Sequence, residues 1–170
     1  MNAALPEIVD AWRMVQARRS FQGSLPLAAL PRLRDSLAGT GGSVTFDLDF
    51  GKDELGVPLV HVRADAVLPL LCQRTLEVFE LPVHVDARLG LIAVEADEAA
   101  LPPGYEPLLT SDGAIRLADV VEDELILALP VVPVKPGSVE NESSFGPAEA
   151  PEEARENPFA VLKKIKVSKN

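Results

Sequence analysis

The residues whose types could support chemistry in this chain are one cysteine, two histidines and three consecutive acidic residues. Cys72 begins the segment Cys-Gln-Arg-Thr, and Thr75 in its fourth position cannot serve as a second thiolate ligand. A structural zinc site needs about four ligands, usually Cys and His. His61 and His84 each lie about 11 residues from Cys72, which is roughly 30 Å or more along an extended strand. The sequence therefore predicts neither a metal site nor a Cys–His nucleophile.

The acidic residues Glu122, Asp123 and Glu124 stand at the head of an apolar run. Carboxylates that bind a catalytic magnesium ion converge on one cleft from separate elements. Successive helical residues instead point about 100° apart, so these three are not expected to form a nuclease site. We expect them in the first turn of a helix, where they complement its dipole, with Asp119 and Glu122 spaced as a capping box. No catalytic residue and no cofactor is predicted.

The charge distribution limits the classes of partner. The formal net charge is -10, and it divides into +2 for residues 1–42, -16 for residues 43–162 and +4 for residues 163–170. An acidic body repels phosphate backbones and attracts basic partners. RNA contact is therefore predicted only at the two basic ends. The candidate residues are Arg13, Arg18, Arg19, Arg32, Arg34, Lys163, Lys164, Lys166 and Lys169.

Alternation of apolar and polar residues predicts three strands, over residues 43–50, 60–70 and 79–89. A hairpin tip at Cys72–Thr75 joins the last two, and the phase of Leu76 indicates a bulge just after it. His61 and His84 are expected to face each other across this hairpin, on a solvated surface. We expect the replacement of Cys72 by Ser to cost little stability, as at an ordinary surface position.

Shorter elements are expected before and after these strands. Asp10 caps a helix through Ala17, and Pro31 begins a second helix that ends before Gly39. A short strand is expected over residues 105–110, and a helix that is apolar almost all round then ends at Pro130. The predicted fold is α+β, an antiparallel meander with about three helices packed on one side.

The length of 170 residues allows one domain and a tail. We predict a domain over residues 1–135, a disordered acidic linker over 136–156 and an apolar, basic motif over 157–170. That motif either folds back on the body or binds a partner as a linear peptide. The chain lacks an apolar run of ~20 residues, a secretory signal and a second cysteine, which predicts a cytoplasmic protein without membrane contact. The oligomeric state stays open.

Three segments together resemble the YceD family, whose name refers to accumulation of large-subunit ribosomal RNA. They are Cys72-Gln73-Arg74, the run from Val121 to Val134, and the segment from Asn157 to Leu162. Many members of the family have Cys-x-x-Cys at the hairpin tip, where this chain has Thr75. The resemblance implies a docking role for Cys72, Arg74, Glu122, Asp123, Glu124, Asn157, Pro158, Phe159 and Leu162.

The resemblance also implies a function. It predicts a non-enzymatic factor for processing or accumulation of 23S ribosomal RNA and for biogenesis of the large ribosomal subunit, with a ribosomal protein or pre-ribosomal RNA as partner. The acidic body is suited to a basic ribosomal protein. The alternative is a protein that binds RNA directly through its basic N-terminal third and lysine-rich tip. A metal-dependent ribonuclease is a further alternative with less support from the residues.

Overall fold

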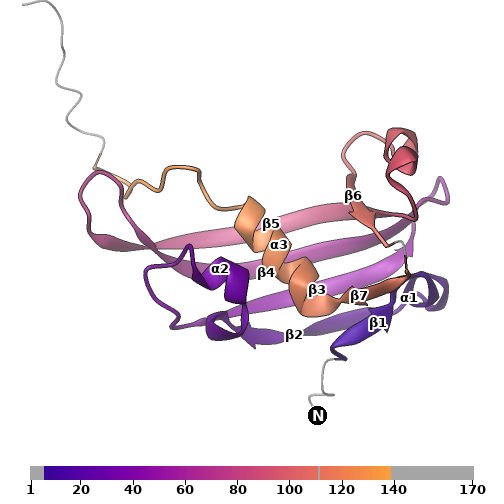
Figure 1. Cartoon of the computed structure of the whole chain (residues 1–170), viewed down its shortest axis with the longest axis horizontal. Coiled ribbons are helices and arrows are strands. Elements are labelled where there is room, and N and C mark those ends of the chain that lie inside the picture. The colour runs from indigo at the N-terminus through magenta and orange to yellow at the C-terminus, as the bar shows by residue number, and fades with distance from the viewer. Residues whose placement is uncertain (1–5, 111, 139–170) are drawn as a thin grey trace, which may run out of the picture. The chain divides into compact units, whose positions relative to one another are not determined.

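The computed structural model describes residues 6–110 and 112–138. Figure 1 shows the elements in the order β1 (Ile8–Asp10), α1 (Ala11–Ala17), β2 (Ser20–Pro26), η1 (Leu27–Ala29), α2 (Pro31–Arg34), β3 (Ser43–Lys52), β4 (Pro58–Leu71), β5 (Val78–Ile92), η2 (Glu95–Ala100), β6 (Glu106–Leu109), β7 (Ala114–Arg116) and α3 (Leu117–Leu127). Residues 139–156 of the linker predicted over 136–156, and the motif predicted over 157–170, lie outside the described residues, so the predicted domain boundaries stay predictions.

The main sheet has the strand order β2-β3-β4-β5-β6. Its neighbours pair antiparallel, except that β5 and β6 run parallel. Strands β1 and β7 pair antiparallel in a separate two-stranded sheet. The predicted α+β class with an antiparallel meander is therefore confirmed.

One face of the main sheet forms the core because successive side chains along a strand point to opposite faces. The apolar residues of β3 at positions 44, 46, 48 and 50 are each at most 4% exposed, and the even positions of β4 from Val60 to Leu70 are buried with them. Residues of α1, α2 and α3 belong to the same apolar cluster. Figure 1 shows α2 and α3 over this face of the sheet.

The first two helices begin where the sequence predicts. Asp10 caps α1, since its Oδ1 accepts a hydrogen bond of 3.0 Å from the backbone N–H of Arg13. Pro31 occupies the first turn of α2. Proline lacks a backbone N–H, but an N–H in the first turn would have no partner within the helix, so nothing is lost there. However, α2 ends at Arg34 and not near Gly39 as expected. The chain turns there, and the N–H of Ala38 donates to the carbonyl of Pro69 in β4 at 2.8 Å.

The register of the β4–β5 hairpin corrects two expectations. His84 pairs with Asp65 and His61 pairs with Arg88, so the two histidines do not face each other. The ladder between β4 and β5 is continuous, and the expected bulge is not there. Leu76 instead lies in the loop with a φ of 58°, and the N–H of Cys72 donates to the carbonyl of Glu77. The tip is longer than predicted, which shifts the register.

Strand β2 was not predicted, because only Phe21 and Leu25 within it are partly buried and its polar residues hide any alternation. It pairs with β3 along its whole length at the edge of the sheet. Within residues 6–110 and 112–138, no helix is long and apolar enough to cross a membrane.

Candidate functional site

The tip of the β4–β5 hairpin is closed on one side by the segment that leaves α3. We call residues 130–135 the strap. The N–H of Gln73 donates to the carbonyl of Pro133 at 2.9 Å, and Lys135 Nζ bonds Glu77 Oε2 at 3.1 Å. Val134 packs against a small apolar cluster that contains Cys72. The strap therefore joins two segments that are far apart in the sequence and that both carry the family resemblance.

Cys72 is fully buried between the tip and the strap. Its Sγ accepts hydrogen bonds from the backbone N–H of Lys135 at 3.3 Å and of Thr75 at 3.4 Å. The Lys135 donor, with those of the tip, lowers the pKa of the Cys72 thiol to about 6, although burial alone would raise it. The expectation of an ordinary surface position is wrong, because Cys72 ties the strap to the hairpin.

Glu122 connects α3 to α2. It is 1% exposed, and its Oε1 accepts hydrogen bonds from the N–H groups of Arg32 at 2.7 Å and Leu33 at 3.0 Å. Its Oε2 accepts a third bond from Arg32 Nε at 3.1 Å. Helix α3 begins at Leu117 without a side-chain cap, so the expected capping box is wrong. Glu122 lies in the second turn and caps the neighbouring helix instead.

Arg32 is held by two members of the acidic triplet. Besides Glu122, its guanidinium forms a salt bridge with Asp123. Lost hydration lowers the pKa of Arg32, but hydrogen bonds and charge from Asp123 and Glu122 outweigh it and raise that pKa above its ordinary value. These bonds compete with any phosphate for Arg32, which was predicted as an RNA-contact residue.

Glu124 does not share the partner of Glu122 and Asp123, which is Arg32. Glu124 is 7% exposed, and its carboxylate forms no hydrogen bond or salt bridge within the described part of the chain. Burial, followed by the charges of Glu106 on β6 and of Asp123, raises the pKa of Glu124 to about 7. The triplet therefore fans out as predicted from helical geometry, and its members do different things.

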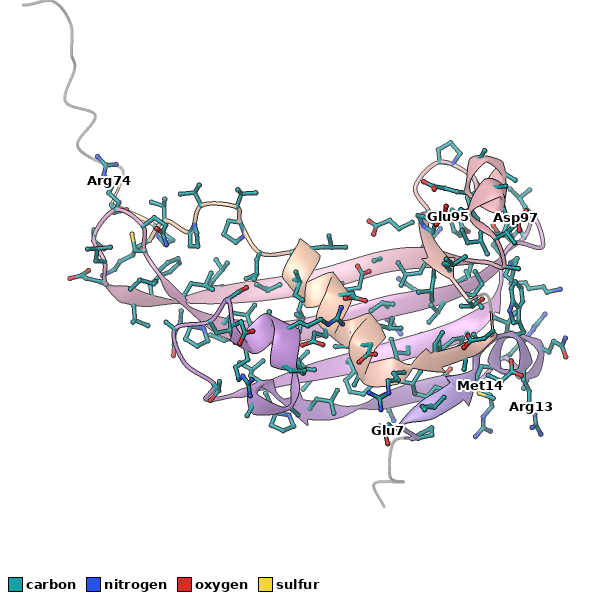
Figure 2. The ribbon with its side chains drawn as sticks, in the orientation of Figure 1. Glu7, Arg13, Met14, Arg74, Glu95 and Asp97 are labelled. Carbon is teal, nitrogen blue, oxygen red and sulfur yellow. The ribbon has the colours of Figure 1, made fainter. Side chains whose placement is uncertain are left out.

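The predicted basic residues of the N-terminal third do not form one cluster. Arg13, Arg18 and Arg19 are exposed at α1, whereas Arg34 lies on α2 beside Asp35. Figure 2 shows Arg74 at the hairpin tip and Arg13 at the opposite end of the sheet. The predicted site residues Asn157, Pro158, Phe159, Leu162, Lys163, Lys164, Lys166 and Lys169 lie outside the described residues.

A groove that was not predicted lies between β5 and the strap. It has a volume of about 490 Å³, and its lining includes Phe79, Leu81 and Val83 of β5 together with Ala128, Val132 and Val134. The opposite face of the sheet is polar. It holds the pairs His61–Asp86, His84–Asp65 and Arg63–Asp49, and in residues 6–110 and 112–138 no three His, Cys or acidic side chains gather as a metal site.

Comparison with known proteins identifies the family. A family model described as "Large ribosomal RNA subunit accumulation protein YceD" matches residues 60–166. The chain belongs to the YceD family. It is 30% identical over 167 residues to a curated YceD protein of Haemophilus influenzae (strain ATCC 51907 / DSM 11121 / KW20 / Rd), covering 95% of this chain and 96% of that one. No solved structure matches the chain.

The YceD match includes the hairpin, the strap and α3, which together form the arrangement described above. Sequence reasoning found Cys72 and the acidic triplet in this YceD chain but missed Glu106, the strap contacts and the groove. The out-of-phase position of Leu76 was the one available signal of an unusual tip. The partner of Glu122 had no signal, because Arg32 lies 90 positions away.

Proposed function

We propose that this YceD protein is a non-enzymatic factor for 23S ribosomal RNA accumulation that acts by binding a basic protein of the large ribosomal subunit. The family name supports the link to large-subunit ribosomal RNA. The proposed mode of action rests on one observation, the distribution of unpaired charge over the described residues.

The body carries more carboxylates than cations, so several carboxylates have no cation beside them. Arg32, Arg63, Arg116 and Lys135 each bond a carboxylate. By contrast, Glu80, Glu106 and Glu124 form no salt bridge with other described residues. With a net charge of -10, such a surface repels phosphate and attracts a basic protein.

The absence of catalysis is also a proposal, and the geometry of the triplet supports it. The oxygens of Glu122 are occupied by α2, Asp123 bonds Arg32, and Glu124 lies apart from both. Carboxylates arranged in this way do not converge on a magnesium ion. Incubation of the pure protein with precursor ribosomal RNA and Mg²⁺ should leave the RNA intact, and metal-dependent cleavage would overturn the proposal.

Direct RNA binding is the second candidate. Arg13, Arg18 and Arg19 are exposed on or next to α1, and they form no salt bridge among residues 6–110 and 112–138. RNA bound there should dissociate steeply as salt rises, because each phosphate contact releases counterions. A triple Arg→Ala variant at these positions would then lose most RNA affinity.

A deletion strain tests the proposed function. Loss of the gene should lower mature 23S ribosomal RNA relative to 16S, or cause 23S precursors to accumulate. The wild-type gene should restore the ratio, and so should the triple Arg→Ala variant if protein binding is the main activity. A normal ratio in the deletion strain would refute the proposed function. Restoration by the wild type but not by the triple variant would favour direct RNA binding.

A further inference from the structure

Strand β5 has an open edge between the hairpin tip and β6. β6 pairs with Leu89–Ile92 alone, so residues 78–88 of β5 have a strand neighbour on one side only in the described structure. The backbone N–H of Cys72 donates to the carbonyl of Glu77, and these two residues stand opposite each other just beyond the pair Leu71–Val78. Cys72 and Glu77 are therefore a hydrogen-bonded pair of the antiparallel ladder. Bonded and non-bonded pairs alternate in an antiparallel ladder. The even-numbered residues of β5 therefore direct their N–H and C=O groups to the open edge.

The apolar groove lies beside this edge. Phe79 and Val83 of β5 are at most 8% exposed, whereas Val132 of the strap is 60% exposed. In Figure 1 the strap, coloured orange, runs alongside β5 toward the tip. An added strand along the edge would place alternate side chains toward this groove, where they would bury apolar surface.

Glu124 lies on α3, just before the residues that line the groove. It precedes Ala128, which lines the groove, by one helical turn on the same face of the helix. Its carboxylate is also repelled by the charge of Glu106, and Glu106 pairs with Leu89 at the end of the open edge. Every fully buried side-chain oxygen or nitrogen among the described residues has a partner. Because Glu124 has none, its carboxylate oxygens remain accessible despite its 7% exposure.

We propose that the open edge of β5 and the adjoining groove bind an extended, lysine- or arginine-bearing segment of a basic partner protein. The segment adds as a strand to β5, its apolar side chains enter the groove, and one of its cations bonds Glu124. This inference rests on the proposed function and names the site at which the ribosomal protein binds. The unpaired carboxylates of Glu80, Glu106 and Glu124 give the charge complementarity that selects such a segment.

Other occupants fit less well. RNA would place phosphates against these carboxylates. A second copy of the chain, paired edge to edge through β5, would bring two molecules of net charge -10 together, and like charges at an interface are unfavourable. Pro82 removes one N–H from the edge, which restricts pairing. The N–H groups of His84, Asp86 and Arg88 remain available to a partner strand.

The test uses the full chain and, as the probe, RNA-free total protein extracted from purified large ribosomal subunits. Hydrogen exchange of the full chain, with and without the bound probe protein, should show slowed exchange within residues 78–88. His84→Pro removes an outward N–H without breaking a bond to β4, and it should weaken binding about tenfold. His84→Ala is the matched control, since it loses the same imidazole but keeps the N–H, and it should bind about tenfold more tightly than His84→Pro. Glu124→Gln should also weaken binding about tenfold, whereas Glu54→Gln, in the β3–β4 loop, should not.

Each failure has a separate meaning. If no large-subunit protein binds the wild type, the proposed function itself is refuted. If one binds but His84→Pro and Glu124→Gln bind it equally well, only the groove assignment is wrong. Concentration-dependent dimerisation that His84→Pro abolishes would assign the edge to a second copy. Slow exchange in the free chain that is lost when residues 139–170 are removed would assign it to the chain's own tail.

Discussion

Glu124 should make the protein less stable as the pH rises, and replacing it by Gln should remove this loss. Burial, with the charges of Glu106 and Asp123, raises the pKa of Glu124 from 4.5 to about 7 in the folded state. Between these values the unfolded chain releases a proton that the folded chain keeps. The destabilisation is therefore negligible below pH 4.5, grows between pH 4.5 and 7, and is complete above pH 7.

The magnitude follows from the size of the pKa change. One pKa unit corresponds to about 1.4 kcal/mol, so a rise from 4.5 to about 7 can lower the free energy of unfolding by at most about 3.5 kcal/mol. Water that still reaches the carboxylate reduces this value, and we expect about 1–3 kcal/mol. A domain of this size is stable by only about 5–15 kcal/mol, so the effect should be easy to measure.

The assay is urea unfolding of the wild type and of Glu124→Gln at pH 5 and pH 8. The variant should exceed the wild type by about 1–3 kcal/mol at pH 8 and by less than about 1 kcal/mol at pH 5. Glu54→Gln is the control for removing one charge from an acidic protein, and it should change stability little at either pH. An equal stability difference between Glu124→Gln and wild type at both pH values would refute the reasoning, because it would show that protonation of Glu124 is not linked to folding.

Three further predictions concern the other site residues. Glu122→Gln should lower the free energy of unfolding by about 2–3 kcal/mol at neutral pH, because a buried carboxylate bonded to α2 is lost. Asp123→Asn should lower it by less than about 1 kcal/mol, and equal losses in urea unfolding would contradict the assigned roles. Since the folded-state pKa of Cys72 is lowered from 9.0 to about 6, the free energy of unfolding should rise between pH 6 and 9 in the wild type but not in Cys72→Ala. The thiolate absorbance should titrate near pH 6, and elemental analysis should find no stoichiometric zinc; a thiol that titrates near pH 9, or one zinc per chain, would show that the tip is misassigned. Truncation after Pro136 should leave the circular dichroism of the sheet unchanged, yet the truncated protein should fail to restore 23S ribosomal RNA in a deletion strain. Phe159→Ala should reproduce much of that loss, whereas neutralising one lysine should not. Full restoration by the truncated protein would show that the tail is dispensable.

The strands that bury one full face could be predicted from the sequence, and the edge strand could not. Residues 43–50 alternate strictly because β3 is central and its even positions all enter the core. In β2, the corresponding positions are only partly buried, and Gly23 lies where an added Cβ would be 3.2 Å from the ring of Phe46. A glycine that allows close packing has no side chain, so it adds nothing to the alternation of apolar and polar residues by which a strand is predicted.

The roles of the site residues depended on contacts that local patterns do not contain. Helical geometry correctly predicted that Glu122, Asp123 and Glu124 diverge, because it needs only neighbouring positions. It could not predict which of them is buried against α2, since Arg32 is 90 positions away from Glu122. The burial of Cys72 was missed for the same reason, because its donor Lys135 is 63 positions away.

The two candidate surfaces lie far enough apart to act independently. The carbonyl of Arg19 accepts a bond from Phe50, which pairs with Val60 of β4, whereas Val83 and Phe79 of the groove pair with Ala66 and Leu70. The groove therefore begins about 20 Å along the extended strand from Val60. A partner protein at the β5 groove would therefore leave the arginines near α1 open to RNA. Because the sites share no contacts, the free-energy effects of Glu124→Gln on protein binding and of the triple Arg→Ala variant on RNA binding should add without coupling.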